Sequence, residues 1–357
     1  MDITLNIGSI IDLLSFSTAF MLGCLFLFKP PKATIFLGLF MLSLSLEILG
    51  ALSNNLAESN TIDLFIPMDT VYVTLVFLLI YIKKIVNLNI KKIEWFLFLP
   101  GILINILFWL GFFFKESLLL SLFEYSFNVA IILYLFKILK EHLKSITEFY
   151  SEIEQKTLSW INTILIVFLF FNILWFVEDL VGLFNGNLPE IFSIVSTIIT
   201  FLLVYWIGYK GISQPENFKE THFRKKVPPI TKTNFSPEVN SDDEFVFKTI
   251  YNRIQEEKLF VNKDLNLRTL AIVLETKEKE LSRLINTCSK TNFYHFINEF
   301  RVAKFKELLT SPKAKQLSIL GLAEEAGFSS KSTFYTAFKK VEGITPKQYE
   351  LMMKKSE

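Results

Sequence analysis

Long apolar stretches, separated by short polar segments, fill most of the first 212 residues. A helix that crosses a membrane needs about 20 mostly apolar residues. Seven stretches approach this length: 7–28, 33–53, 64–82, 93–114, 118–139, 158–184 and 188–212. The pattern therefore predicts a seven-helix transmembrane bundle over residues 1–212.

Lysine and arginine occur in alternate connections between these stretches. They follow the first, third, fifth and seventh stretches, whereas the N-terminus and the other connections contain only Lys115. Lys and Arg in short loops are retained on the cytoplasmic side of a membrane. The alternation thus predicts an external N-terminus and a cytoplasmic tail, an arrangement that requires an odd number of spans.

The composition changes after residue 212. Residues 213–243 contain four prolines and many polar residues without an apolar period. This predicts a flexible linker, or one that in part relays a signal as an ordered segment. Residues 244–357 contain 20 Lys and Arg against 14 Asp and Glu, an excess of +6, which favours a polyanionic partner.

The tail has helical periodicity and no strand alternation, so we expect an all-α protein. Near its end, a short helix over residues 319–325 is followed by Gly327, which suits a turn with positive φ. Ser329 or Ser330 can cap the next helix, which buries Phe334 and Phe338. Its other face carries hydrogen-bonding side chains: Lys331, Ser332, Thr333, Tyr335, Thr336 and Lys339. A helix of this kind can lie in a DNA major groove.

A similar pair of short helices precedes it. Its predicted core consists of five leucines: Leu267, Leu270, Leu274, Leu281 and Leu284. Ala271 is small enough for two helices to cross closely, and Thr276 is the expected cap of the second helix. That helix would present Lys277, Lys279, Ser282 and Arg283 to solvent. A long amphipathic helix over residues 293–309 would link the two pairs rigidly.

The tail resembles the DNA-binding domain of the AraC/XylS family of bacterial transcription regulators over about residues 264–349. The family's closing phrase, GF-x5-F-x3-FK-x3-G-x-TP-x2-Y, is matched by Gly327, Phe328, Phe334, Phe338, Lys339, Gly343, Thr345, Pro346 and Tyr349. The segment FRVAKFKELL is similar to the family's linking helix at Arg301, Leu308 and Leu309. Two positions depart from the family, because Glu275 and Lys290 stand where it usually has glycine.

The segments LSRLIN and NFYHFINEFRV resemble a subgroup found in Bacteroidetes-type bacteria, in which such a tail follows several membrane helices. The resemblance implies a multi-pass protein of the bacterial inner (cytoplasmic) membrane, with its tail in the cytoplasm. The expected domains are the transmembrane bundle (1–212), the linker (213–243) and an AraC-type DNA-binding domain (244–357). The last would contain helix-turn-helix units at about 266–287 and 318–340.

By family analogy, the exposed faces of the two recognition helices bind DNA. The residues are Lys279, Ser282 and Arg283 in the first and Lys331, Ser332, Thr333, Thr336 and Lys339 in the second. Arg283 fits base reading on chemical grounds, since a guanidinium can bond guanine O6 and N7 together. For each of these residues the alternative is a phosphate contact or a merely solvated face.

Polar groups within membrane spans are costly and indicate function by default. Five acids fall in the outer half of the predicted bundle: Glu47, Asp69, Glu124, Glu178 and Asp179. With Asn128 and Asn172 they predict a ligand-sensing cavity that opens to the outside and suits a cationic or proton-donating ligand. The alternative is that acids near span ends reach interfacial water, or bond Ser and Asn neighbours.

Signatures of catalysis are lacking from the sequence. The three histidines, His142, His222 and His295, are scattered, and no His-Glu-x-x-His motif, Ser-His-Asp set or P-loop is evident. The two cysteines cannot form a metal quartet. We therefore expect no enzyme activity, no metal and no cofactor.

These patterns predict a membrane-embedded, one-component transcription regulator that binds double-stranded promoter DNA and responds to a small ligand or signal through its spans. One alternative is a DNA-binding regulator with a passive or proteolytically released anchor. Another is a seven-span transporter or membrane enzyme with a regulatory tail. RNA polymerase and a second copy of the chain are further candidate partners. An amphipathic helix at 245–260 would either pair two chains or pack on the DNA-binding core.

Overall fold

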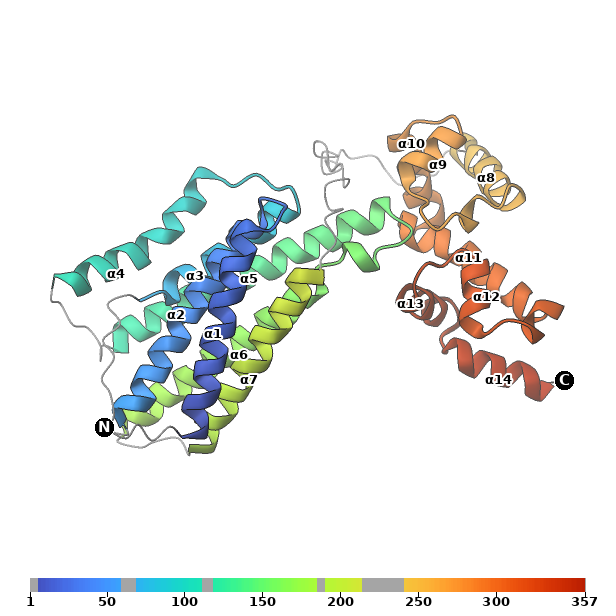
Figure 1. Cartoon of the computed structure of the whole chain (residues 1–357). Helices are drawn as coiled ribbons and strands as arrows, with labels where there is room; N and C mark the ends of the chain where they lie inside the picture. Colours follow the sequence, from blue (N-terminus) through green and yellow to red (C-terminus); the bar gives the residue numbers. More distant parts are fainter. Residues whose placement is uncertain (1–5, 59–68, 111–117, 185–189, 214–240, 357) are drawn as a thin grey trace. The chain divides into compact units, whose positions relative to one another are not determined.

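The computed structural model describes residues 6–58, 69–110, 118–184, 190–213 and 241–356. Within these residues the named elements are all helices and no sheet is formed, as expected (Figure 1). It divides into two compact units. We call Met1–Leu139 with Leu158–Arg224 the apolar unit, and Lys140–Thr157 with Lys225–Glu357 the tail unit.

The apolar unit contains the helices α1 (Ile7–Phe28), α2 (Thr34–Glu58), α3 (Val71–Ile85), α4 (Leu99–Trp109), the first part of α5 (Leu118–Phe149), α6 (Ser159–Leu183) and α7 (Glu190–Ser213). A 3-10 helix, η1 (Lys92–Phe98), leads into α4. Six segments in the described ranges are long and apolar enough to cross a membrane. The remaining predicted span, 64–82, overlaps residues 59–68, which lie outside the described residues. Its described part is the 15-residue helix α3, so the count of seven stays a prediction.

Two observed helices differ in extent from the predicted apolar stretches. The predicted stretch at 93–114 is divided between η1 and α4. Pro100 lies in the first turn of α4, where its missing N–H costs no intrahelical hydrogen bond. The stretch predicted to end at residue 139 continues as α5 to Phe149. This extension is amphipathic, with Ile146 fully buried and Lys140 and Lys144 exposed, which keeps the helix stable beyond its apolar part.

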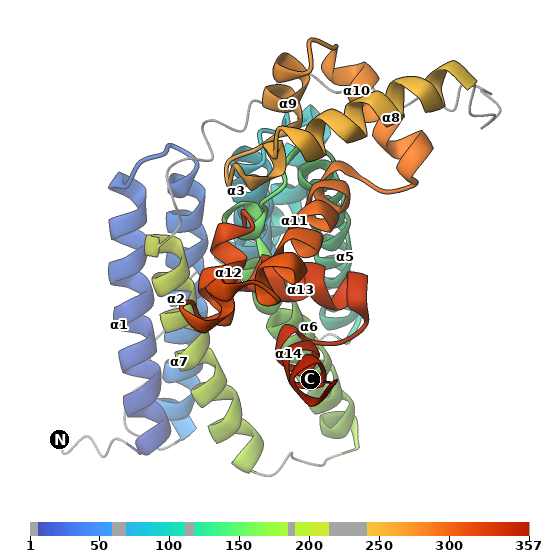
Figure 2. The same ribbon diagram turned by 90° about the vertical axis from the view of Figure 1, so that its right-hand side faces the viewer.

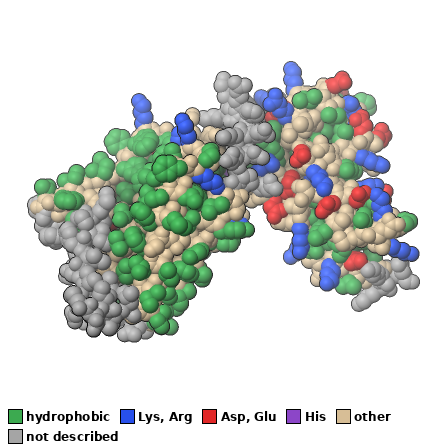
Figure 3. Space-filling view, in the orientation of Figure 1, with side chains coloured by type: hydrophobic (Ala, Val, Ile, Leu, Met, Phe, Trp, Pro, Cys, Tyr) green, Lys and Arg blue, Asp and Glu red, His purple; other side chains and the backbone are tan. Residues whose placement is uncertain are grey.

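Glycines bring α1, α2 and α7 together. A Cβ atom on Gly38 of α2 would lie 2.9 Å from the carbonyl oxygen of Gly23 in α1. A Cβ on Gly208 of α7 would lie 2.5 Å from Leu22 Cδ1. Small residues let helices approach closely, which is how helices associate in lipid. Outward-facing side chains on this unit are mostly apolar (Figure 3), a surface suited to lipid rather than water.

The tail unit contains α8 (Ser241–Glu256), α9 (Leu267–Val273), α10 (Glu278–Leu284), α11 (Phe293–Leu309), α12 (Ile319–Glu325), α13 (Lys331–Glu342) and α14 (Pro346–Ser356). A single π-helical turn, η5 (Ile285–Ser289), prolongs α10. In both views α11 runs between the α9–α10 pair and the α12–α13 pair (Figures 1 and 2). The helix predicted at 293–309 is therefore confirmed as the link between the pairs.

Two hydrophobic cores lie on successive parts of α11. Phe296 and Phe300 pack with the first helix pair and α8, whereas Phe305 and Leu308 pack with the second. The ring of Tyr251 in α8 lies 4.7 Å from that of Phe300. Of the two roles considered for residues 245–260, packing on the core is the one observed. Pairing of two chains stays a prediction.

Candidate DNA-binding surface

The α12–α13 pair is set by local signals that the sequence displays. Ser318 and Ser330 cap the two helices, accepting hydrogen bonds from Gly321 N at 3.1 Å and Thr333 N at 3.2 Å. Gly327 has a φ of +102°, and a Cβ there would lie 2.8 Å from Phe260 O. Only glycine fits this turn without strain. Phe334 and Phe338 are fully buried, as predicted.

The outward face of α13 carries most of the predicted DNA-binding side chains. Lys331, Ser332, Thr336 and Lys339 are exposed. A hollow of about 400 Å³ is lined by Tyr335, Thr336, Lys339, Lys340 and Thr345. Cationic and hydroxyl groups along one helix face suit both phosphate and base-edge contacts.

Thr333 is an exception, because it is 3% exposed. Its expected place on the open face is therefore wrong in this structure. Its hydroxyl donates a 2.5 Å hydrogen bond to the carboxylate of Glu152, which belongs to the segment between α5 and α6. The hydrophobic periodicity of α13 could not predict this contact between Thr333 and Glu152, since Glu152 lies 181 residues earlier in the chain.

The α9–α10 pair follows the predicted core with two local differences. Leu267, Leu270, Leu281 and Leu284 are buried, and Leu274 is partly buried. The expected cap at Thr276 is wrong, since α10 is preceded by Lys277, which makes no side-chain cap. The turn before it is made by Glu275 at φ +55°, in the left-handed region where the family usually has glycine. Lys290, the other departure, also has a φ of +55°.

On α10, Lys279 is exposed, Ser282 is half-buried and Arg283 is held by two carboxylates. The Arg283 guanidinium donates to Asp243 of α8 at 2.7 and 2.8 Å and to Glu280 at 2.6 and 3.2 Å. The hydrogen bonds to Asp243 and Glu280 raise the pKa of Arg283, and the pKa of Asp243 falls correspondingly. The guanidinium of Arg283, which is predicted to read a base, is therefore already hydrogen-bonded to two carboxylates of the same chain.

Arg301 is buried in the tail unit, unlike Arg283, and holds several carbonyl groups together. It is fully buried and donates to Phe260 O and Asn262 O, both at 2.8 Å, and to Asn298 Oδ1 at 3.1 Å. It also donates to Ser151 Oγ at 3.1 Å and Ser151 O at 3.3 Å. Burial lowers the pKa of Arg301 to about 10, so the group stays charged at neutral pH. Five donors in one plane let it tie several carbonyl groups together.

The segment between α5 and α6 belongs to the tail unit and contacts residues of both helix pairs there. Ser151 is fully buried and donates through N and Oγ to Leu265 O at 3.3 and 2.6 Å. Tyr150 and Asn266 form an isolated antiparallel bridge. The Glu152 carboxylate accepts hydrogen bonds from Ser329, at 2.7 Å, and from Ser330, at 3.3 Å, in addition to Thr333. Sequence reasoning missed this contact, because the segment reads as an ordinary polar loop.

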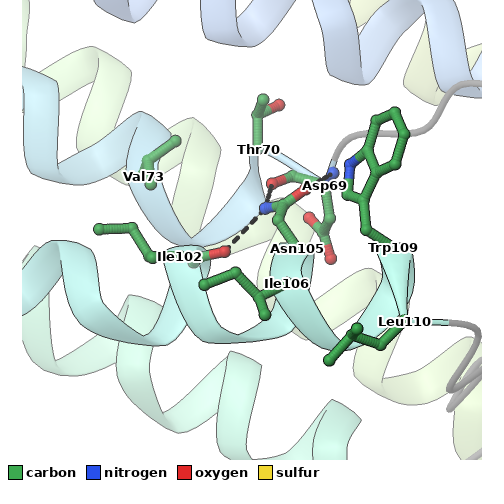
Figure 4. A pocket seen from close by; sticks show the side chains of 9 residues that line it. Asp69, Thr70, Val73, Ile102, Asn105, Ile106, Trp109 and Leu110 are labelled. Atoms are coloured by element: carbon green, nitrogen blue, oxygen red, sulfur yellow. Dashed lines mark hydrogen bonds between the residues drawn. The ribbon is translucent and has the colours of Figure 1, made fainter.

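One pocket in the described part of the apolar unit contains a residue of the predicted sensing set. A pocket of about 420 Å³ between α3 and α4 is lined by Asp69, Thr70, Val73, Gly101, Ile102, Asn105, Ile106, Trp109 and Leu110 (Figure 4). Of the predicted set, only Asp69 lies there. Asn105 accepts from Asp69 N at 2.8 Å and donates to Asp69 O at 2.7 Å. The pocket is otherwise mostly apolar.

Four of the predicted acids lie near enough to interact electrostatically, because the charges of Asp69, Glu47 and Asp179 act on Glu124. Glu47 of α2 accepts a hydrogen bond from Thr74 of α3. Asp179 of α6 accepts one from Tyr125 of α5 at 2.9 Å. Glu124 and Asn128 lie one turn apart on α5, and Glu178 adjoins Asp179. Among the described residues, the Oδ1 atoms of Asn128 and Asn172 are buried without a hydrogen-bond partner.

Comparison with known proteins bears on the tail. A family model described as a helix-turn-helix domain matches residues 270–351, from α9 into α14. Residues 270–351 form an AraC-type helix-turn-helix domain. A domain of this type is typical of DNA-binding transcription regulators rather than of enzymes. No match was found among curated proteins or solved structures.

Proposed function

We propose that this chain is a one-component transcription regulator of the bacterial inner membrane, which binds promoter DNA through two helix-turn-helix units and is regulated through its spans. The AraC-type domain carries the proposal, because its match accompanies an exposed cationic face on α13. Six apolar helices in the same chain favour a membrane location. Tethering would place sensor and DNA reader in one molecule, without a diffusing messenger.

Base reading falls to the exposed side chains of α10 and α13. Lys331, Ser332 and Thr336 would contact base edges from α13, since the N-terminal part of a recognition helix lies deepest in the groove. Arg283 would read guanine once it leaves its carboxylate partners. Lys339 would contact phosphate, so its effect on affinity would be the same for all sequences.

The test is genome-wide cross-linking of the tagged, full-length chain to DNA, with membrane and soluble fractions analysed separately. We expect discrete genomic sites in the membrane fraction. The double variant Lys331→Ala/Thr336→Ala should lose them, whereas Lys347→Ala, an exposed lysine of α14, should keep them. Sites found only with a soluble fragment would favour a released anchor. A membrane fraction without DNA sites would favour a transporter or another membrane function.

The proposed topology has an external N-terminus, seven spans and a cytoplasmic tail, as the lysine alternation predicts. Reporter fusions after residues 55, 116 and 187 should report an external location, and fusions after residues 89 and 151 a cytoplasmic one. A cytoplasmic signal at residue 187 would refute the seven-span arrangement.

Sensing is assigned to the polar residues within the spans, namely Glu47, Asp69, Glu124, Asn128, Glu178 and Asp179. Support comes from the cost of burying such groups in a membrane and from the Oδ1 atom of Asn128, which could accept a hydrogen bond from a ligand. The pocket beside Asp69 offers one point of entry. A ligand there would act by preferring one packing of the spans over another.

A further inference from the structure

The N-terminus of α13 holds an anion in this structure. The Glu152 carboxylate accepts hydrogen bonds from three hydroxyl groups, those of Ser329, Ser330 and Thr333. A helix N-terminus attracts negative charge through its free N–H groups and its dipole. The helix has 12 residues, long enough for this effect. Glu152, which supplies the bound carboxylate, precedes Ser329 by 177 positions and Thr333 by 181 positions. The contact is therefore not a product of local chain geometry.

A DNA backbone phosphate has the same requirements as this carboxylate. Proteins bind DNA phosphates with serine and threonine hydroxyls and with helix N-termini. The three hydroxyls lie in or just before the first turn of α13, the helix that also carries the proposed base readers Lys331, Ser332 and Thr336. A duplex seated on those residues would bring its own anion to the first turn of the helix, where Glu152 now lies. The two anions cannot occupy one set of donors, and their like charges repel.

We propose that residues 150–154 are an internal competitor of DNA, in which the Glu152 carboxylate occupies the α13 site that takes a backbone phosphate when DNA binds. The inference rests on the DNA-binding function proposed above and specifies its regulation. DNA binding then requires this segment to withdraw from α13.

The competitor is anchored firmly enough to act as a regulated element. Ser151 is held by Leu265 O, by Arg301 and by Asn298 Nδ2, which donates to Ser151 O at 3.1 Å. Buried hydrogen bonds of this kind are costly to leave unpaired, so the segment has one defined docked position. Withdrawal must therefore be a discrete event rather than a gradual loosening.

Chain connectivity supplies the route for a signal. The segment follows α5 directly and precedes α6, and the apolar unit contains α6 and the first part of α5. A change in the packing of these two helices would therefore displace both ends of the segment. A signal in the membrane would reach the recognition helix through covalent structure, without passing through residues 214–240.

The test measures binding of the full-length chain, in lipid nanodiscs, to a fluorescent random-sequence duplex of about three helical turns. Glu152→Gln and Glu152→Ala remove the competing charge. Glu154→Gln removes the same charge from an exposed position two residues later and is the matched control. We expect the Glu152 variants to bind about tenfold more tightly than the wild type, and the control to stay within about twofold, because general repulsion of DNA is screened by salt.

A second measurement follows the segment itself. The Ser151 amide, bonded to Leu265 O, should be protected from hydrogen exchange in the free chain and lose protection when duplex saturates it. Equal affinities of the Glu152 variants and the control, or unchanged Ser151 protection with DNA bound, would overturn the proposal. Wild-type binding without a gain in the Glu152 variants refutes only the competitor. Failure of all variants to bind duplex refutes the DNA-binding function as well.

Discussion

Arg283 and Asp243 are joined by two hydrogen bonds, from Nη1 to Oδ2 at 2.8 Å and from Nη2 to Oδ1 at 2.7 Å. This is the bidentate arrangement that an arginine would make with O6 and N7 of a guanine. The same donors cannot serve both partners. The predicted reader of α10 therefore has to exchange an internal anion for a base before it can contribute to sequence recognition.

Removing that anion should favour DNA. Asp243→Asn weakens the hold on Arg283, so we expect the full-length chain to bind duplex about two- to fivefold more tightly, as suits an exposed ion pair. Asp242→Asn, at the exposed neighbouring position, controls for the loss of one negative charge. Fluorescence anisotropy at several salt concentrations measures both. Equal effects of the two substitutions would show that Asp243 does not restrain Arg283.

Sequence preference should depend on Arg283 and overall affinity on Lys339. Arg283→Ala should cost about 1–3 kcal/mol at one base position and relax the preference there. Lys339→Ala should weaken binding to all sequences alike and reduce its salt dependence. Selection from a random duplex library, followed by sequencing, separates these effects. An unchanged preference profile in Arg283→Ala would remove Arg283 from base reading.

The turns at Gly327 and Glu275 should differ in how a substitution changes stability: we expect replacement of glycine to destabilise the first, and introduction of glycine not to destabilise the second. Gly327→Ala places a Cβ 2.8 Å from Phe260 O at a φ of +102°, so we expect a loss of about 1–3 kcal/mol in the free energy of unfolding of the tail unit. Glu275→Gly removes a Cβ from a residue at φ +55° and should be neutral or gain up to about 1 kcal/mol. Thermal unfolding measures both. A Gly327→Ala variant as stable as the wild type would contradict the steric reading of this turn.

Acid should destabilise the tail unit through His295. Burial, with a smaller contribution from the Lys340 charge, lowers the pKa of His295 from 6.5 to about 4. Between these values the unfolded chain binds a proton that the folded chain does not, so stability falls as the pH drops from about 6.5 to about 4. His295→Gln should flatten this slope, as measured by hydrogen exchange of α11 at several pH values. Identical slopes in variant and wild type would exclude His295 as the cause.

The acids of the spans should affect signalling without affecting DNA binding. Glu47 bonds Thr74 across α2 and α3, and Glu124 lies on α5, the helix that leads into residues 150–154. We expect Glu47→Gln and Glu124→Gln, alone or together, to give a constitutive or locked response from a reporter behind a promoter identified by genome cross-linking. Glu141→Gln, an exposed position later on α5, is the control. Normal regulation in the double variant, at normal protein levels, would exclude these two acids from sensing.

The sequence by itself determined the elements whose signals are local. The bounds of α11 and α12 match the prediction, because Asn292 and Ser318 cap them and their buried faces repeat at helical spacing. Gly327 and the phenylalanines of α13 were predictable for the same reason. The prediction of a cap at Thr276 was wrong because the chain turns at Glu275, whose backbone is in the left-handed region. Hydrophobic periodicity contains no information about the conformation of a turn residue.

Only the tertiary structure decided which anions meet the predicted DNA-binding residues. Asp243 is 40 residues from Arg283, and Glu152 is 181 residues from Thr333. Residue type and spacing mark Arg283 and Thr333 as hydrogen-bond donors, but they do not say what those donors contact. That depends on how α8 and the segment after α5 fold back onto the tail unit. Long-range contacts of this kind arise from packing of the whole unit and leave no period in the sequence.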